Sequence, residues 1–308
     1  MTIHSPRLLA LTFLLIVFPQ FTVAQQSADP EFNTVVAQPA YTKTFPRVLF
    51  DEAHNNFHTT VGRYKPFADL IVSDGYHVVR GRKPFTKPTL DSFKVLVIAN
   101  ALGAEDMDDD GAGAPAFTDE ECDAVREWVK EGGALLLIAD HAPFGSAAEN
   151  LGKRFGVDMS KGYTLDPENS LKDFGPSQLV FSRENKLLLD HPITQGRNAS
   201  ERINRVYTFT GQSLKGPEGS VAFMSLGASA KDRADRASTT EVSAAGRAQG
   251  LAFKFGKGRV VMTGEAAMLS AQLAGAENRP MGMNVSGSDN RQLALNIMHW
   301  LSGLLKER

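Results

Sequence analysis

Four apolar runs of the sequence each end in polar side chains that could bind a ligand or move a proton. The runs cover residues 47–50, 95–99, 134–139 and 260–264. The polar residues that follow them are Asp51, Glu52, His54, Asn55, Asn56, Asn100, Asp140, His141 and Glu265. In an open parallel α/β sheet, ligands bind outside the carboxyl ends of the strands. We therefore expect these side chains to line a pocket for a small polar ligand, such as a carbohydrate or a cell-envelope component.

The same residue types also allow a hydrolytic reaction. Carboxylates and imidazoles can transfer protons, and they can hold a divalent metal, the one cofactor that the sequence suggests. The metal candidates are His54, His58 and His141. The candidates for catalysis are His141, Asp140 and Glu52, with water activated by a metal or by His141. The alternative is a scaffold in which these side chains only close turns and cap helices.

A second cluster has the pattern of a calcium loop. Asp106, Asp108 and Asp110 alternate and are followed by Gly111, as at the start of an EF-hand loop. The twelfth position is Phe117 rather than the bidentate Glu that completes such a loop. A weak calcium site and a solvated acidic loop both remain compatible with this pattern.

Composition excludes some functions. The chain has 308 residues, is 42% hydrophobic and has a formal net charge of −2. No basic stripe is present, so we expect no nucleic-acid partner. Cys122 is the only cysteine, which rules out an internal disulfide. It shares a helical apolar stripe with Val125 and Trp128, and this indicates a buried small side chain rather than a nucleophile.

The N-terminus has the pattern of an export signal. Arg7 precedes an apolar run over residues 8–18, and small residues at 22–24 offer a cleavage site. We expect a signal peptide over residues 1–24, a polar linker over 25–44 and a periplasmic or secreted protein. The apolar run is short for a membrane span, so none is expected after cleavage, although an uncleaved anchor is the alternative.

Alternating strand and helix patterns predict an α/β domain with a mostly parallel sheet and helices on both faces. Thr118 and Glu121 form a capping-box pattern at the start of one helix. We expect one domain over residues 45–308, with an irregular insertion at about 156–250. The predicted strands cover 47–50, 76–80, 94–99, 134–139, 221–226, 251–255 and 260–263, and the longer helices cover 59–74, 118–131, 146–155 and 290–304.

Four sequence motifs follow one another along the chain: Phe50-Asp51-Glu52-Ala53-His54-Asn55-Asn56, Trp128-Val129-x-x-Gly132-Gly133-Ala134-Leu135-Leu136-Leu137, His191-Pro192-Ile193-x-x-Gly196 and Asn296-x-x-x-Trp300-Leu301-Ser302-Gly303. Together they resemble class I glutamine-amidotransferase-like domains, and among them the GldG-like and DUF4350 branch. The resemblance spans about residues 45–305 and implies a flavodoxin-like three-layer sandwich. Active members carry a Cys nucleophile on a strand-to-helix turn. The corresponding turn, 139–143, has no Cys, Ser or Thr, so the resemblance implies a domain without glutaminase chemistry.

Overall fold

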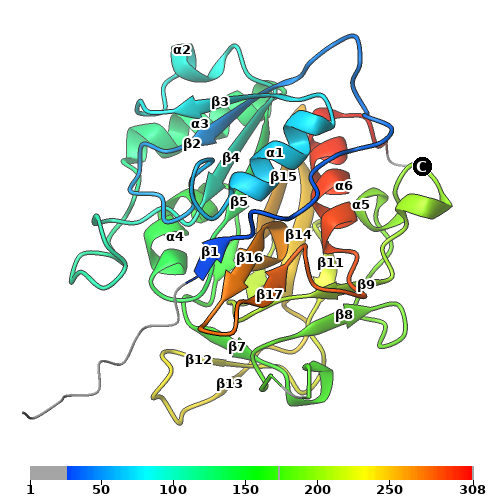
Figure 1. Cartoon of the computed structure of the whole chain (residues 1–308). Helices are drawn as coiled ribbons and strands as arrows, with labels where there is room; N and C mark the ends of the chain where they lie inside the picture. The colour runs from blue at the N-terminus through cyan, green and yellow to red at the C-terminus, as the bar shows by residue number, and fades with distance from the viewer. Residues whose placement is uncertain (1–25, 173, 307–308) are drawn as a thin grey trace, which may run out of the picture.

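The centre of the molecule is a mixed β-sheet (Figure 1). The computed structural model describes residues 26–172 and 174–306, so the predicted signal peptide lies outside the described residues. Nine strands of the described part form this sheet, in the order β3-β2-β4-β5-β15-β14-β10-β6, with β11 also paired to β14. Their bounds are β3 (His77–Gly81), β2 (Arg47–Asp51), β4 (Val95–Ala99), β5 (Ala134–Ile138), β15 (Gly258–Thr263), β14 (Ala248–Phe255), β10 (Leu214–Lys215), β6 (Asp158–Met159) and β11 (Val221–Ser225).

The α/β class is confirmed, but the expected mostly parallel sheet is only partly present. Strands β3, β2, β4, β5 and β15 run parallel to one another. The pairings of β14 with β15, β10 and β11, and of β10 with β6, are antiparallel. A tight turn joins β14 to β15, and such a connection requires antiparallel strands. The other antiparallel strands come from the predicted insertion.

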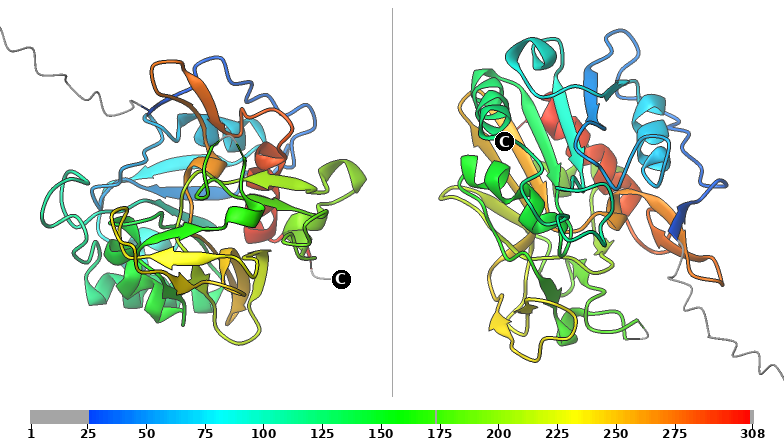
Figure 2. Two further views of the ribbon diagram at one scale, coloured as in Figure 1. Left: turned by 90° about the horizontal axis from the view of Figure 1, so that it is seen from below. Right: turned by 90° about the vertical axis from the view of Figure 1, so that its left-hand side faces the viewer.

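Helices cover both faces of the sheet, as Figure 2 shows in its right-hand view. Helices α1 (Lys65–Ser73) and α6 (Asn290–Ser302) pack on one face, and α3 (Asp119–Glu131) and α4 (Phe144–Arg154) on the other. Successive side chains of β4 enter opposite cores, because a strand alternates its faces. The predicted helix over 59–74 begins only at Lys65, after turns over residues 59–64. Two short helices, α2 (Lys87–Leu90) and α5 (Pro192–Gln195), complete the α-helices of the described residues.

Three smaller sheets accompany the central one. Their strands are β1 (Gln26–Ala28), β16 (Ala271–Ala274) and β17 (Arg279–Gly282) in the first, β7 (Tyr163–Leu165), β12 (Lys231–Arg233) and β13 (Val242–Ser243) in the second, and β8 (Val180–Ser182) and β9 (Arg205–Tyr207) in the third. Three 3₁₀ turns, η1 (Pro167–Asn169), η2 (Ala199–Glu201) and η3 (Ala267–Leu269), lie between these elements. The segments after β5 and β15 therefore supply most of the structure outside the central sheet.

The segment expected to be a linker packs along the domain in its described part. β1 pairs antiparallel with β16. The amide of Ala40 donates to Asp74 Oδ1 at 2.8 Å, and the Tyr41 hydroxyl donates to Ser302 Oγ at 2.8 Å. These contacts join sequence positions more than thirty residues apart, which the polar composition of the segment gave no means to predict. Within the described residues, no helix has the length and apolar character needed to cross a membrane.

Candidate functional site

A cavity of about 430 Å³ lies where three strands of the parallel part of the sheet end. Asn100 follows β4, Asp140 follows β5, and Glu265 comes two residues after β15. All three line the cavity, together with His58 and His141. Its volume is in the range usual for small-molecule sites. The structure thus brings together side chains that are up to 207 residues apart in sequence, as His58 and Glu265 are, at the edge where sheets of this kind bind ligands.

The turn after β5 is held by a network of hydrogen bonds. The amide of Asp140 donates to Asn100 Oδ1 at 3.0 Å, and Asn100 adopts a positive φ of 52° that directs its side chain to this turn. Gln212 Nε2 donates to the carbonyl oxygens of Ala139 at 2.8 Å and Asp140 at 3.0 Å. This network fixes Asp140 at the cavity before any ligand arrives.

Asp140 and Glu265 are two buried carboxyl groups that influence each other. Asp140 accepts a hydrogen bond from the His141 amide at 2.7 Å, and Glu265 accepts from the amides of Ala267 at 2.7 Å and Met268 at 2.8 Å. Burial raises the pKa of Asp140, although His141 and the hydrogen bonds oppose this rise. Burial also raises the pKa of Glu265 well above its usual value, and the charge of Asp140 adds to this effect. The pair therefore retains a proton more readily than free carboxylates, so it can donate as well as accept hydrogen bonds.

Glu265 has a structural role besides its place in the cavity wall. Its two oxygens accept the first amides of η3, from a position one residue before the N-cap Ala266. Glu265 therefore has both of the roles that the sequence allowed: it accepts the first amides of a helical turn, and it lines the cavity.

Two side chains of the cavity wall have polar atoms without a hydrogen-bond partner among the described residues. Gln272 on β16 is fully buried, and both its amide nitrogen and its amide oxygen are unpaired. His58 Nδ1 is also unpaired, and its ring stacks on Tyr64 with ring centres 4.7 Å apart. Burial lowers the pKa of His58 to about 3, so the ring is neutral at physiological pH. Buried polar groups normally form hydrogen bonds, so these unpaired atoms indicate a binding site for a polar ligand.

His141 has an imidazole nitrogen available for chemistry. Its Nδ1 lies 2.7 Å from the carbonyl oxygen of Ala142, and its ring stacks on Tyr163 with centres 4.6 Å apart. A carbonyl oxygen can only accept, so Nδ1 carries a proton, and the neutral form of the ring has its lone pair on Nε2. No described residue bonds to Nε2. His141 lies beside Asp140 and is only partly buried in the cavity wall.

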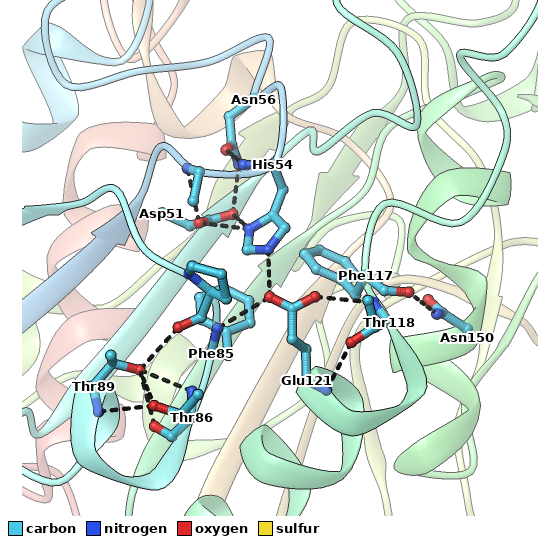
Figure 3. Close-up of polar contacts among 12 residues, drawn as sticks. Asp51, His54, Asn56, Phe85, Thr86, Thr89, Phe117, Thr118, Glu121 and Asn150 are labelled. Carbon is cyan, nitrogen blue, oxygen red and sulfur yellow. Dashed lines mark hydrogen bonds and ion pairs between the residues drawn. The ribbon is translucent and has the colours of Figure 1, made fainter.

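The first polar cluster of the sequence lies elsewhere. Figure 3 shows His54 between two carboxylates, with Nδ1 at 2.9 Å from Asp51 Oδ1 and Nε2 at 2.9 Å from Glu121 Oε1. Asn56 Nδ2 donates to Asp51 Oδ2 at 2.9 Å. The His54 ring also contacts the rings of Phe85 and of Phe117, which lies just before α3, with ring centres 4.6 and 4.8 Å away.

This network connects β2, the segment before α2 and the start of α3. Burial lowers the pKa of His54, but the bonds to Asp51 and Glu121 outweigh it and raise the value overall. Of the ligand-binding candidates, Asp51, His54 and Asn56 are therefore bonded to one another or to Glu121, and none of them lines the cavity. The chain turns after β2 and directs these side chains toward α3, so the structure places them apart from the cavity at the strand ends.

Glu52 and Asn55 also lie outside the cavity wall. Glu52 Oε2 accepts from Arg80 Nε at 2.6 Å, and Oε1 accepts from the Thr60 hydroxyl at 2.6 Å. These bonds lower the pKa of Glu52 against the opposing effect of burial. Asn55 is exposed and has a positive φ of 47°, a conformation that Asn tolerates in turns. Their positions correspond to the structural interpretation of this cluster.

The metal candidates are not brought together. Among the described residues, no group of three or more His, Cys, Asp or Glu side chains is arranged to hold a metal ion. His54, His58 and His141 have the three separate environments described above. In the acidic loop, Asp106 Oδ1 accepts from the Asp108 amide at 3.3 Å, so this carboxylate bonds to the loop itself. Asp110 lies on the exposed part of that loop.

Sequence reasoning missed six polar residues of the cavity wall. These are Gln26, Arg63, Gln178, Thr210, Arg236 and Gln272. Arg63 lies in a turn before α1, Arg236 in a surface loop, and Gln272 on a strand that the sequence did not predict. None of these three follows an apolar run, so the pattern used to find the strand-end residues could not indicate them. A polar residue at an inward position of a short strand is the only signal that Gln272 offered.

Cys122 and its helix agree with the sequence analysis. Cys122 is fully buried, and burial raises the pKa of its thiol to about 12. The capping box is also confirmed: Glu121 receives the Thr118 amide at 3.0 Å and donates its own amide to the Thr118 hydroxyl at 3.2 Å. The Glu121 carboxylate therefore has two roles: it completes the capping box of α3, and it forms a hydrogen bond with His54.

Comparisons with known proteins give structural relatives at low sequence identity. No family model matches the chain, and no curated protein matches it in sequence. It is similar to a solved structure described as "mmIFT52 N-terminal domain", with a TM-score of 0.59 and 15% identity over 83% of this chain and 97% of that one. It is also similar to a ThuA-like protein from Parabacteroides merdae, with a TM-score of 0.45 and 14% identity over 86% and 93% of the two chains. The first similarity shows a shared fold, and none of these identities carries information on activity.

Proposed function

We propose that this protein is an exported amidotransferase-like domain without a nucleophilic cysteine that binds a small, hydroxyl-rich ligand in the strand-end cavity. A carbohydrate or another cell-envelope component has this chemistry. The supporting observation is Gln272, whose whole amide group is buried in the cavity wall without a partner. Leaving a buried donor or acceptor unpaired costs roughly 1–3 kcal/mol, and a ligand hydroxyl can satisfy either atom.

The other polar groups of the wall suit the same ligand. Asp140 and Glu265 can donate or accept because burial favours their protonated forms. Neutral His58 offers Nδ1, and Asn100 adds an amide. Hydroxyl groups both donate and accept, so such a mixed lining matches them better than it matches a purely anionic or apolar molecule. The aromatic rings of Phe57, Phe144 and Phe209, which also line the cavity, provide apolar surface for the faces of a sugar ring.

The test is ligand binding to variants of one side chain. Gln272→Leu keeps the approximate volume and removes both polar atoms, so sugars that stabilise the wild type in a thermal-shift screen should bind at least about tenfold more weakly, as expected for a loss of roughly 1.4 kcal/mol. Gln249→Leu is the control, because Gln249 is also buried with an unpaired amide nitrogen but lies outside the cavity wall. Equal affinity of both variants for every ligand found would contradict the proposal.

A hydrolase is the second candidate, and the tautomer of His141 favours it. Its Nε2 lone pair faces no described partner, so it can remove a proton from water at the cavity. The buried acid pair can supply a proton to a leaving group. We expect His141→Gln to lower any ester, amide, phosphoester or glycoside hydrolysis by 10²-fold or more, the usual range for one general base. His77→Gln, an exposed change on β3, is the control.

Export is a separate part of the proposal. The sequence pattern of residues 1–24 supports it. Expression of the full chain in a secretion-competent bacterium, followed by cell fractionation and mass spectrometry, should yield a protein outside the cytoplasm that begins at Gln25. An intact N-terminus in the membrane fraction would instead support the uncleaved anchor.

Membership of the GldG-like and DUF4350 branch, and the flavodoxin-like three-layer sandwich that it implies, also belong to the proposal. The motifs at residues 50–56 and 296–303 support them. The expectation of a domain without glutaminase chemistry is supported by the turn at 139–143, which carries no thiol or hydroxyl. An assay for release of ammonia from glutamine should therefore show no activity above a His141→Gln control.

A further inference from the structure

Two arginine side chains border the cavity without a carboxylate partner among the described residues. Arg63 is about half buried, its guanidinium lies 4.1 Å from the centre of the Phe57 ring, and its Nε donates to the carbonyl oxygen of Gln26 at 3.1 Å. Arg236 lies over the Tyr163 ring at 5.2 Å. Both line the cavity, and neither takes part in an ion pair with the described residues.

Several partly buried arginines of the described chain bond to carboxylates, as Arg197 does with Glu201 and Arg247 with Asp158. Arg259, which lies over the Trp300 ring, and Arg291, which donates to the Val35 carbonyl oxygen, have no carboxylate partner among the described residues, but neither of them lines the cavity. The guanidinium of Arg63 is instead held in place by a ring and a backbone oxygen, which leaves its terminal nitrogens free. A partly desolvated cation without a counter-ion is costly, and an anionic ligand removes that cost.

The acids of the cavity do not replace this counter-ion. Asp140 is buried and Glu265 is fully buried, and backbone amides already donate to the oxygens of both. Neither of them lies within ion-pair distance of Arg63 or of any other described cation. The cavity wall therefore combines hydrogen-bonding carboxyl groups at the strand ends with two cationic side chains, Arg63 and Arg236.

We propose that the ligand is an anionic sugar, whose acidic group is held by Arg63 and Arg236 while its hydroxyl groups bond to Gln272 and the strand-end carboxyl pair. This inference rests on the proposed binding function and specifies its ligand class. A guanidinium group can donate two parallel hydrogen bonds to a carboxylate or to a phosphate, so the structure supports either acidic group. The guanidinium groups of half-buried Arg63 and exposed Arg236 each lie over an aromatic ring and need little reordering to make such bonds.

The experiment compares pairs of sugars, one with an acidic group and one neutral, by titration calorimetry on the wild type. N-Acetylmuramic acid and N-acetylglucosamine differ by a lactyl carboxylate, glucuronate and its methyl ester differ by one charge, and glucose 6-phosphate and glucose differ by a phosphate. We expect at least one anion to bind tenfold or more tightly than its neutral counterpart. Its affinity should fall as salt is raised from 20 to 300 mM, because screening weakens contacts between partly exposed charges.

Variants assign the effect to residues. Arg63→Gln and Arg236→Gln should each remove most of the preference for the anion and leave the affinity for the neutral sugar within about twofold. Arg126→Gln is the matched control, because Arg126 also lies over a ring, Phe255 at 5.6 Å, but is outside the cavity. Arg236 is exposed, so its variant tests the inference even if Arg63→Gln folds poorly.

The outcomes separate the two proposals. A preference for an anion that disappears in the Arg63 or Arg236 variant and persists in Arg126→Gln supports the inference. Equal binding of charged and neutral sugars, with sensitivity to Gln272→Leu, overturns the anionic class and leaves the hydroxyl-rich ligand in place. Absence of binding by every sugar of the panel overturns both.

Discussion

The network around His54 leads to the most quantitative prediction. His54→Ala removes hydrogen bonds to Asp51 and Glu121, both of 2.9 Å, and leaves two acidic side chains near each other without the imidazole between them. His54 is only 8% exposed, so solvent screens these bonds weakly. Hydrogen bonds to charged groups contribute roughly 1.5–3 kcal/mol each, and removing one partner of a buried pair costs roughly 3–5 kcal/mol. We therefore expect a loss of about 3–5 kcal/mol in the free energy of unfolding.

The pH dependence of this loss follows from the pKa shifts. Burial disfavours protonated His54, but Asp51 and Glu121 raise its pKa above the usual 6.5. Because the pKa of His54 is raised in the folded state, the contribution of His54 to the free energy of unfolding is complete below about pH 6.5. This contribution declines as the pH rises through the pKa of the folded state. The pKa of Glu121 is lowered, against burial, by hydrogen bonds that include one from His54, so its contribution declines as pH falls below about 4.5. The difference between wild type and variant should be largest between these limits.

The assay is urea unfolding of both proteins at pH 5.5, 7 and 9, with His77→Ala as the control. His77 is an exposed histidine at the start of β3, and its removal should cost less than about 0.5 kcal/mol, as for most surface changes. A His54→Ala loss below about 1 kcal/mol would refute the reasoning. A loss that stays the same from pH 5.5 to pH 9 would show that protonation of His54 is not what stabilises the network.

Three further predictions concern single side chains. Because burial raises the pKa of Cys122 to about 12, iodoacetamide should modify this thiol only after unfolding, and rapid labelling of the native protein, followed by mass spectrometry, would contradict its place in the core. Thr118→Ala removes the N-cap of α3 and should lower the urea-unfolding free energy by roughly 0.5–2 kcal/mol, whereas an unchanged midpoint would show that the cap is dispensable. Gly75→Ala would place a methyl group 2.0 Å from the Tyr41 carbonyl oxygen and should loosen residues 26–44, measured as faster proteolysis there. Gly246→Ala has a similar positive φ of 74° but no atom within 4 Å, so proteolysis equal to that of this control would argue against the packed segment.

The local elements of the fold could be predicted from the sequence alone. The apolar runs at 95–99 and 134–138 became β4 and β5, and the capping box placed the start of α3 correctly, because these features depend on neighbouring residues. The edge of the sheet at which polar residues gather was also accessible, since parallel strands share the direction of their carboxyl ends. Asn100, Asp140 and Glu265 were found in this way.

Which polar residues face the cavity was decided only by the tertiary structure. His54 had the same type of position as His141, but Glu121, which lies 67 residues further along the chain, bonds to it and closes the first cluster. Gln272 and Arg63 reach the cavity because β16 and the turn before α1 pack beside the strand ends. A local pattern determines which face of an element a side chain occupies, whereas its partner depends on packing between distant segments. For this protein, the sequence therefore determined where a site could form, and long-range packing determined which side chains make it.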